Sequence, residues 1–154
     1  MNFLQQRDKF INNPSFNGIS SCYCKIQSCA EDDEWVQLIN IFSDNIYTLN
    51  LSPSAHNFLS IAYSNLGKKE LAIEEKRVAE YLIKEILNTG NGSREQPYKI
   101  TTLSDEDDVI KYMGKTSLND KSEKHNGKLL HRITLEDGSE KIFDIDHLQR
   151  FIRF

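Results

Sequence analysis

Residues 54–87, SAHNFLSIAYSNLGKKELAIEEKRVAEYLIKEIL, decide the fold of this chain. Apolar residues recur there at intervals of three and four positions on both sides of Gly67, and that spacing is typical of amphipathic helices. The stretch therefore predicts two helices joined at Gly67. Paired helices of this kind usually present a surface to another protein, so we expect a protein that binds rather than one that carries out a reaction.

The predicted hairpin resembles the tetratricopeptide repeat, a helix–turn–helix unit of about 34 residues. Two features depart from that repeat: Lys76 replaces an aromatic residue, and the closing proline is missing. Small side chains at several matching positions would let the two helices approach closely. The residues that match the repeat are Leu59, Tyr63, Gly67, Ala72 and Ala79.

A first helical hairpin is predicted over residues 17–49, offset from the second by about 34–37 residues, which is near the period of the repeat. The acidic run at 31–34 predicts the first turn of its second helix, because carboxylates favour the positive end of the helix dipole. A cation site at this run is the alternative. The first helix of this hairpin carries a stripe made of Ile19, Cys22, Tyr23, Ile26 and Cys29.

The second half of the chain predicts shorter elements. Gly90 is expected to end the long helix in a left-handed conformation, and a strand is expected at 98–103. Ser104 then begins a capping-box pattern with Asp107, which predicts a helix that ends at Gly114. Residues 115–127 hold one large apolar side chain, so we expect a mobile loop there and a candidate contact surface.

A β-hairpin is predicted at the end of the chain, with its turn at residues 136–138. A two-residue turn and a type I turn with a bulge at Gly138 compete, and they differ in which residues share a face. The bulged turn pairs odd positions with odd positions and so gathers the apolar residues on one face. It is therefore the one we choose. Those residues are Leu129, Ile133, Leu135, Phe143 and Ile145.

Together these patterns predict an α+β protein. Four or five helices in tetratricopeptide-like hairpins come first, and a small antiparallel sheet with one further helix packs against them. We expect a helical region at 1–90 and a small α+β region at 91–154 that share one core. A length of 154 residues suits a single compact domain.

Composition and charge narrow the class of partner. The formal net charge is −4, and residues 1–53 carry three basic and six acidic side chains. Nucleic acid would need a basic stripe, so we expect a protein partner, with a basic one favoured. The chain shows no apolar run that would span a bilayer and no signal peptide at its start, so we expect a cytoplasmic protein without a membrane partner. The oligomeric state stays open.

Motifs for chemistry are missing from the sequence. It has no nucleophile elbow, no zinc-protease motif and no phosphate-binding glycine loop. Three cysteines are expected to be free thiols, with Cys24 exposed, and a metal site there is the weaker alternative. His131 is expected to be a packed, hydrogen-bonded histidine. Asp144 and Asp146 form a carboxylate pair that has no partner nearby in the sequence. We therefore expect no catalytic residue, no metal and no cofactor.

Residues 82–145 resemble a bacterial family known only as a domain of unknown function. The matching pattern is a long helix, then Gly90, Gly92, Ser93 and Glu95, then Ser104-Asp105-Glu106 through Gly114, and finally Phe143-Asp144-Ile145. Two features depart from that family, because Asp107 replaces an aromatic residue and an export leader is missing. The resemblance implies an α+β domain with its helices first, and it implies no catalytic residues.

The function predicted from the sequence is non-catalytic binding of a protein. Aromatic and arginine side chains dominate protein interfaces, so we expect the binding surface along the second helical hairpin and its neighbour. One alternative is an immunity protein that neutralises a secreted, basic bacterial toxin. The other is an uncharacterised hydrolase or transferase, which a pocket holding Asp144 or a titration-shifted histidine would favour. The candidate binding residues, all expected to be exposed, are Trp35, Tyr47, His56, Arg77 and Tyr81.

Overall fold

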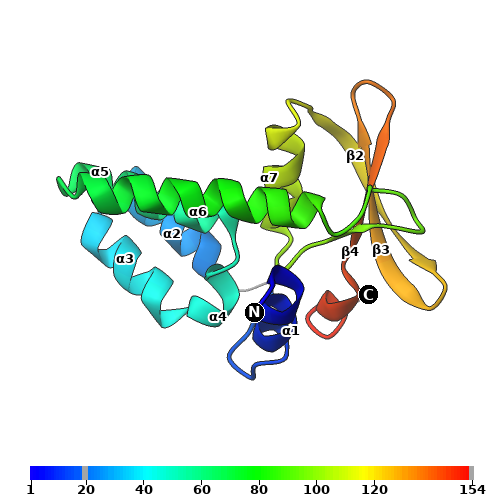
Figure 1. Ribbon diagram of the computed structural model, residues 1–154, viewed down its shortest axis with the longest axis horizontal. Coiled ribbons are helices and arrows are strands. Elements are labelled where there is room, and N and C mark those ends of the chain that lie inside the picture. Colours follow the sequence, from blue (N-terminus) through cyan, green and yellow to red (C-terminus); the bar gives the residue numbers. More distant parts are fainter. Residues whose placement is uncertain (19–20, 153–154) are drawn as a thin grey trace.

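The computed structural model of the protein describes residues 1–18 and 21–152 (Figure 1). Ile19, the first residue of the predicted stripe, lies outside the described residues. The helices are α1 (Phe3–Ile11), α2 (Cys22–Glu31), α3 (Trp35–Asp44), α4 (Ile46–Leu49), α5 (Pro53–Asn65), α6 (Lys69–Leu87), α7 (Ser104–Tyr112) and the 3-10 helix η1 (Asp146–Leu148). The strands are β1 (Tyr98–Lys99), β2 (Ser117–His125), β3 (Lys128–Leu135) and β4 (Glu140–Asp144).

The architecture is α+β, as predicted. Helices α2 to α6 lie on one side of the molecule, the sheet lies on the other, and α7 stands between them (Figure 1). Six helices precede the sheet in the described part of the chain, instead of four or five. One reason is Asn45, which separates α3 from α4. Its side-chain amide donates to the carbonyl oxygen of Ile41 (2.8 Å) and so interrupts a segment that was predicted as one helix.

Both helical hairpins turn through a residue with positive φ. Gly67 has φ 76° between α5 and α6, which confirms the predicted turn, and Asp33 has φ 59° between α2 and α3. In each turn the next amide reaches back to a helix carbonyl: Lys68 N donates to Tyr63 O (2.8 Å), and Glu34 N donates to Cys29 O (2.8 Å). This bond is typical of a Schellman helix end. The two turns lie 34 residues apart, as a repeated hairpin requires.

The acidic run at 31–34 leads into α3 and places Glu34 at its N-cap position, without a side-chain capping bond, but the prediction that the run forms the first turn is wrong. Glu31 is the last residue of α2, and no acidic residue lies in the first turn of α3. Asp33 instead adopts the left-handed conformation of the turn, which aspartate tolerates better than most side chains do. The run is therefore a solvated connection between two helices.

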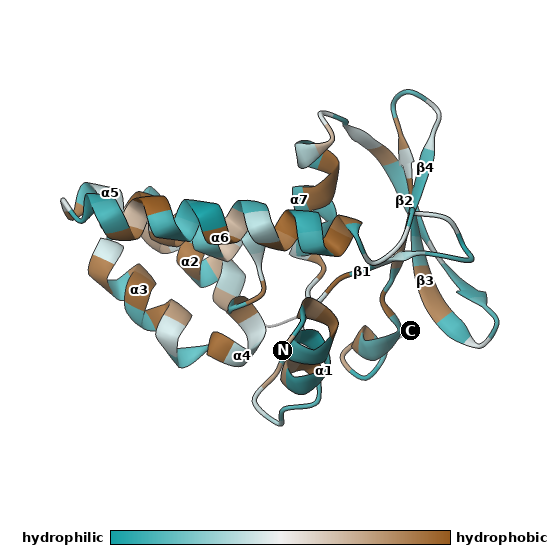
Figure 2. Cartoon of the chain, in the orientation of Figure 1, coloured by the Kyte–Doolittle hydropathy of each residue, from teal (hydrophilic) through white to brown (hydrophobic). Residues whose placement is uncertain are grey.

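Helices α5 and α6 pack closely through small residues. Ala72 and Ala79 are buried on α6, and the Ser60 hydroxyl of α5 donates to the carbonyl oxygen of Ala72 (2.7 Å). Figure 2 shows hydrophobic and hydrophilic segments alternating along α6, as expected for a helix with one covered face. None of the described helices is long and apolar enough to cross a membrane.

Two hydrophobic clusters stabilise the fold. One lies within the helical hairpins and is formed by α2, α3 and α5, around residues such as Ile26, Leu38 and Leu59. The other joins α1 and the end of α6 to α7 and the sheet, around residues such as Ile86 and Phe143. The sheet is thus anchored on the N-terminal helix as well as on the long helix that leads into it. The division of the chain at residue 90 stays a prediction.

The sheet has the strand order β1-β4-β3-β2. Strands β2, β3 and β4 are antiparallel, whereas β1 pairs with β4 in parallel, so the sheet is mixed and not purely antiparallel. Strand β1 covers only Tyr98–Lys99 of the predicted strand at 98–103. Gly138 has φ 83°, and His131 lies opposite Phe143. Odd positions therefore pair with odd positions, which confirms the bulged turn.

The predicted mobile loop at 115–127 is wrong, because Ser117–His125 form strand β2. Asn126 (φ 50°) and Gly127 (φ 79°) make the turn into β3, and two positive φ values are the mark of the type I′ turn that suits a β-hairpin. The residues of β2 are exposed or half-buried. The strand therefore depends on backbone pairing with β3, and apolar composition was a poor guide to it.

Two smaller predictions about caps are also wrong. Ser104 makes no capping bond, because α7 already begins there and Leu103 precedes it without a side-chain cap. Gly90 is not among the glycines with positive φ. A Cβ atom on Gly90 would lie 2.4 Å from the carbonyl oxygen of Gln96 and 2.5 Å from that of Pro97. Glycine is therefore required at position 90 by a close backbone approach.

Candidate functional site

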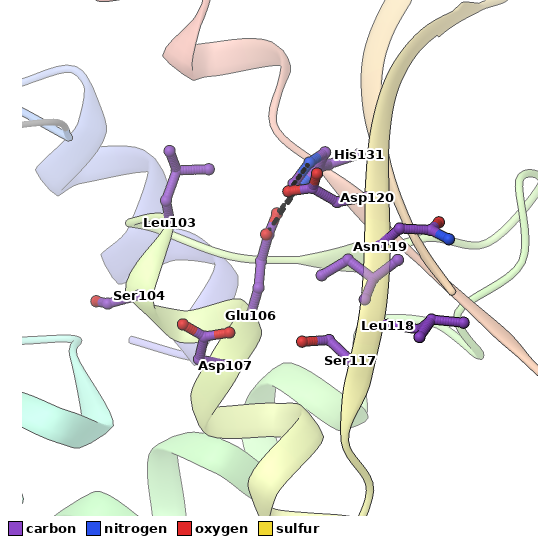
Figure 3. Close-up of a pocket in the computed structure, with 10 residues that line it drawn as sticks. Leu103, Ser104, Glu106, Asp107, Ser117, Leu118, Asn119, Asp120 and His131 are labelled. Carbon is purple, nitrogen blue, oxygen red and sulfur yellow. Dashed lines mark hydrogen bonds and ion pairs between the residues drawn. The ribbon is translucent and has the colours of Figure 1, made fainter. Parts of the chain in front are cut away.

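A cleft of about 480 Å³ lies between α7 and the neighbouring face of β2 and β3 (Figure 3). Helix α7 contributes acidic side chains from its first turn, β2 contributes residues near its start, and β3 forms the floor. The lining residues are Leu103, Ser104, Glu106, Asp107, Ser117, Leu118, Asn119, Asp120, His131 and Ile133. None of them is a lysine or an arginine, so the cleft favours a cationic ligand.

The centre of the cleft is a histidine held between two carboxylates. His131 Nδ1 lies 2.7 Å from Oε2 and 3.0 Å from Oε1 of Glu106. Its Nε2 lies 3.2 Å from Oδ2 of Asp120. In Figure 3 the Glu106 and Asp120 side chains, from α7 and β2, both point toward the imidazole ring. The predicted hydrogen bonding of His131 is confirmed, but its partners come from two elements that sequence analysis did not connect with it.

Burial and hydrogen bonding act together on this pair. Burial raises the pKa of Glu106, although its hydrogen bond to His131 opposes that effect. The hydrogen bond to Glu106 raises the pKa of His131. A protonated imidazole donates from both nitrogens, and each nitrogen here faces a carboxylate. The arrangement therefore favours the imidazolium form, which has no free lone pair with which to accept a proton from a substrate.

The exposed side of the cleft is negative. Asp107 is exposed on α7, and the side chain of Asp120 is 68% exposed on β2. Glu106 is only 5% exposed, and His131 is the group that compensates it. Two accessible carboxylates thus remain for a ligand that enters from solvent. Such a ligand is expected to carry a positive charge, because a cation beside a carboxylate is the favourable pairing.

The hydrogen-bond pattern of the sheet shows which backbone groups point out of β2. The amide of Leu135 donates to Ser139 O (2.8 Å), and that of Ile145 donates to Leu129 O (3.2 Å). Odd-numbered residues of β3 therefore bond to β4. Successive residues of an antiparallel strand bond to alternate sides, so the even-numbered residues of β3 bond to β2.

Those even-numbered residues lie opposite odd-numbered residues of β2, as Arg132 lies opposite Lys121. The backbone N–H and C=O groups of Asp120, Ser122 and Lys124 consequently point away from the sheet. In the described part of the chain no strand lies on that side of β2. The backbone groups of these three alternate residues are therefore available to pair with another strand beside the acidic cleft.

The side chains at these open positions share the face of the cleft. Asp120 lies opposite Ile133, and Ser122 lies opposite His131, and directly opposed residues point to the same face of a sheet. Lys121 and Glu123 point to the other face. There Glu123 bonds to Arg94 (2.8 Å) and to Arg132 (3.1 Å). A strand added to β2 would thus place alternate side chains at the cleft.

The five predicted binding residues are spread over α3 to α6. Trp35 and Tyr47 are half-buried, and Tyr47 packs edge-on against Phe10 with ring centroids 5.4 Å apart. Arg77 and Tyr81 are exposed on α6, as expected. All five lie in the described part of the chain, and no hydrogen bond, ion pair or ring contact joins any two of them. The structure does not bring them together into one site.

His56 was expected to be exposed, and that expectation is wrong. Its side chain is buried, with Nδ1 2.5 Å from Oε2 of Glu75 and Nε2 2.8 Å from the carbonyl oxygen of Asn50. Its ring also packs edge-on against Phe42. The histidine links α5 to α6 and to the preceding turn, so it supports the helical hairpin from within.

The carboxylate pair of Asp144 and Asp146 has a structural role, and Asp144 also lines a second cleft of about 370 Å³. Asp144 is buried and accepts a hydrogen bond from the backbone amide of Asp146 (3.0 Å), with Lys128 Nζ 3.5 Å away. Asp146 accepts from the amide of Leu129 (2.9 Å). Asp144 follows Phe143, which lies opposite His131, so it points to the opposite face from the cleft. The pair orders the end of β4.

A buried polar cluster supports the cleft from behind. Arg7 Nε donates to Ile100 O (2.7 Å), and Arg7 Nη2 lies 3.1 Å from His147 Nδ1. Burial lowers the pKa of His147 to about 4, so the ring is neutral. Its Nε2 donates to Thr101 O (2.8 Å). Asp105 accepts from the Thr101 amide (2.9 Å). These bonds fix the chain that enters α7.

Thiols and metal-binding groups add nothing to the site. Cys22 and Cys29 are buried and Cys24 is exposed, and all three are thiols and not disulfides, as predicted. Among residues 1–18 and 21–152, no group of three or more His, Cys, Asp or Glu side chains is arranged to hold a metal ion.

Sequence reasoning missed Glu106 and Asp120 as partners of His131. The signal that could have found Asp120 is Asn126-Gly127, a strong indicator of a two-residue hairpin turn. With that turn, His131 lies opposite Ser122 and next to Asp120 on one face of a sheet. Glu106 had no such signal, because the contact depends on how α7 packs.

Comparisons with known proteins add no relative: no protein-family model matches the chain, and neither the curated proteins nor the solved structures contain a match. The resemblance to a bacterial domain of unknown function therefore remains an expectation.

Proposed function

We propose that this chain is a non-catalytic protein-binding protein, and that the bound protein adds a β-strand to the free edge of β2. The observation that carries the proposal is the row of outward backbone groups at Asp120, Ser122 and Lys124. An added strand satisfies such groups with main-chain hydrogen bonds, which provide affinity. Neighbouring pockets bind alternate side chains of the added strand and so provide specificity.

The β2 edge differs from the other edge of the sheet. Strand β1 is two residues long and pairs in parallel with β4, so it leaves little backbone for another chain. Strand β2 has nine residues. Lysines at an edge often prevent unselected pairing, and Lys121 and Lys124 would reject strands that carry cations at the opposing positions. These two lysines therefore favour a partner strand that carries neutral or acidic side chains opposite them.

The cleft supplies the second part of the recognition. A cationic side chain on the added strand, placed opposite Asp120, would lie at the negative opening between α7 and β2. This supports the proposal of a basic partner, because charge complementarity contributes specificity and a faster association. The chain offers no basic stripe that would favour nucleic acid.

A cytoplasmic location is part of the proposal. None of the three cysteines forms a disulfide in the described part of the chain, and reduced thiols suit a reducing compartment. The exposed thiol of Cys24 would be vulnerable to oxidation elsewhere.

An immunity protein that neutralises a secreted bacterial toxin is a specific form of the same proposal. The negative cleft favours it, because a small acidic inhibitor can cover a basic surface on a toxin. Growth of cells that express a toxin encoded beside this gene, with and without this chain, would test this form. Rescue that is lost in Asp120→Lys would support the cleft as the contact.

A hydrolase or transferase is the second candidate, favoured by a histidine with a raised pKa in a cleft. Its weakness is that both imidazole nitrogens face carboxylates, at 2.7 and 3.2 Å. A general base needs a free lone pair within reach of the substrate. Turnover of any small ester or glycoside that is lost in His131→Gln would favour the enzyme over the binding protein.

A displayed library of random 12-residue peptides tests the proposal. We expect the protein to retain peptides that are enriched in lysine or arginine. Ser122→Pro should abolish retention, because proline removes the outward N–H while the bonds to β3 remain. Ser122→Thr keeps that N–H and is the matched control. Equal retention by the proline variant would overturn strand addition at β2.

A further inference from the structure

We infer that the strand added at β2 is supplied by a second copy of this chain, paired antiparallel about Ser122. This inference rests on the proposed function, because it names the partner of the same edge. It is carried by the order of charges along the strand. Lys121 and then Asp120 precede Ser122, whereas Glu123 and then Lys124 follow it. Residues at equal distances on the two sides of Ser122 therefore carry opposite charges.

The pairing about Ser122 places every charge of the strand opposite its complement. Asp120 lies opposite Lys124 of the second copy on the face of the cleft, and Lys121 lies opposite Glu123 of the second copy on the other face. Both contacts occur twice, because a two-fold interface repeats each contact. Opposite charges that face each other across a sheet are favourable, and like charges are unfavourable.

Neighbouring registers fail this test. Pairing about Lys121 places that lysine opposite its own copy, and pairing about Glu123 does the same for the glutamate. Pairing about Asp120 or Lys124 likewise brings a charged residue against itself. The register about Ser122 is thus the one that the charges select, and a small hydroxyl lies on the axis.

The backbone groups agree with this register. Asp120, Ser122 and Lys124 are the residues whose N–H and C=O groups point outward from β2. Pairing about Ser122 matches even-numbered residues with even-numbered residues. Each outward group therefore meets another outward group, which is the condition for a hydrogen-bonded antiparallel pair.

The two lysines are available for such contacts. Among the described residues, neither Lys121 nor Lys124 makes a side-chain hydrogen bond or ion pair. Lys124 of the second copy then supplies the cation that Asp120 and the negative cleft require. The association joins two four-stranded sheets into one and leaves the short β1 strands as the edges of the described sheet, so it closes as a dimer and does not grow into a fibre.

Sedimentation of the intact chain over a wide range of concentration tests the inference. We expect a concentration-dependent dimer with a mass close to twice 17.8 kDa. Ser122→Pro should remove the dimer, and Ser122→Thr should keep it. A wild-type protein that stays monomeric at every concentration would overturn the inference, as would a dimer that the proline variant leaves intact.

A charge swap tests the register itself. Asp120→Lys and Lys124→Glu should each weaken the homodimer about tenfold or more, because each creates two like-charge contacts across the axis. An equal mixture of the two variants should form a heterodimer of near wild-type affinity, since both contacts are then complementary. Glu80→Lys and Lys84→Glu, exposed on α6, are controls with the same changes in charge. Failure of the mixture to associate would overturn the register.

The peptide library separates this inference from the proposed function. A monomeric protein that still retains peptides through Ser122 overturns the second copy as partner and leaves strand addition standing. A protein that neither associates nor retains peptides overturns both.

Discussion

At the scale of single residues, Asp105 determines how the cleft is built. It is fully buried at the start of α7 and accepts hydrogen bonds from the amides of Thr101 (2.9 Å) and Thr102 (3.1 Å). The Thr102 hydroxyl donates to its other oxygen (3.0 Å). Three donors on one carboxylate fix the chain before the helix and so direct Glu106 toward the cleft. Sequence analysis assigned the capping role to Ser104 instead, because a capping-box pattern cannot show which side chain becomes buried.

The buried carboxyl of Asp105 should make stability depend on pH. Burial raises its pKa to about 7 from 3.8, so the folded protein keeps a proton that the unfolded chain has lost. The stability contributed by Asp105 is complete below about pH 4 and is lost as the pH rises through 7. In Asp105→Asn, the fall in unfolding free energy from pH 5 to pH 8 should be smaller by about 3 kcal/mol, since about two pH units separate pH 5 from the folded-state pKa and each corresponds to about 1.4 kcal/mol.

Urea unfolding of the two proteins at pH 5 and pH 8 gives that difference. Asp107→Asn, a change at an exposed position in the same helical turn, is the control and should leave the pH dependence as in the wild type. An Asp105→Asn protein with the wild-type pH dependence would show that the carboxyl is ionised in the fold.

At the scale of elements, β2 shows why composition misled the prediction. The sequence of the strand, SLNDKSEKH, has almost no apolar residue, and patterns detect strands through the apolar face that they bury. The residues of β2 stay exposed or half-buried across the cleft from α7, so no such face is needed. The following Asn126-Gly127 turn carried the correct signal. The last hairpin was predictable because its apolar residues selected one register, with Ile133 opposite Lys141.

Two proline variants test the orientation of β2. The Lys121 amide bonds to β3, so Lys121→Pro should lower the free energy of unfolding by about 3 kcal/mol. The Ser122 amide points outward, so Ser122→Pro should cost about 1 kcal/mol or less. Denaturant unfolding at low protein concentration measures both in the same background. Equal costs would mean that the outward and inward residues of β2 had been assigned wrongly.

At the scale of the whole molecule, local patterns predicted more of the fold than of the site. The order of helices and sheet, and the turn at Gly67, follow from periodicity that lies within short segments. The cleft needs α7, β2 and β3 to meet, and Glu106 and His131 lie 25 residues apart. Such contacts depend on packing, which no short pattern encodes. Tyr81 is exposed on α6, as predicted, but exposure alone does not define a binding site or its ligand.

The proposed binding depends on another chain pairing with the outer edge of β2. Amide hydrogen exchange measured residue by residue tests this most directly, in dilute protein and again at high concentration or with a retained peptide. In the dilute protein, the amides of Asp120, Ser122 and Lys124 should exchange rapidly, while those of Lys121 and Glu123 are protected. Association should slow the three outward amides to the rate of their neighbours. Association that leaves those three amides fast, while protection appears on another surface, would contradict the account.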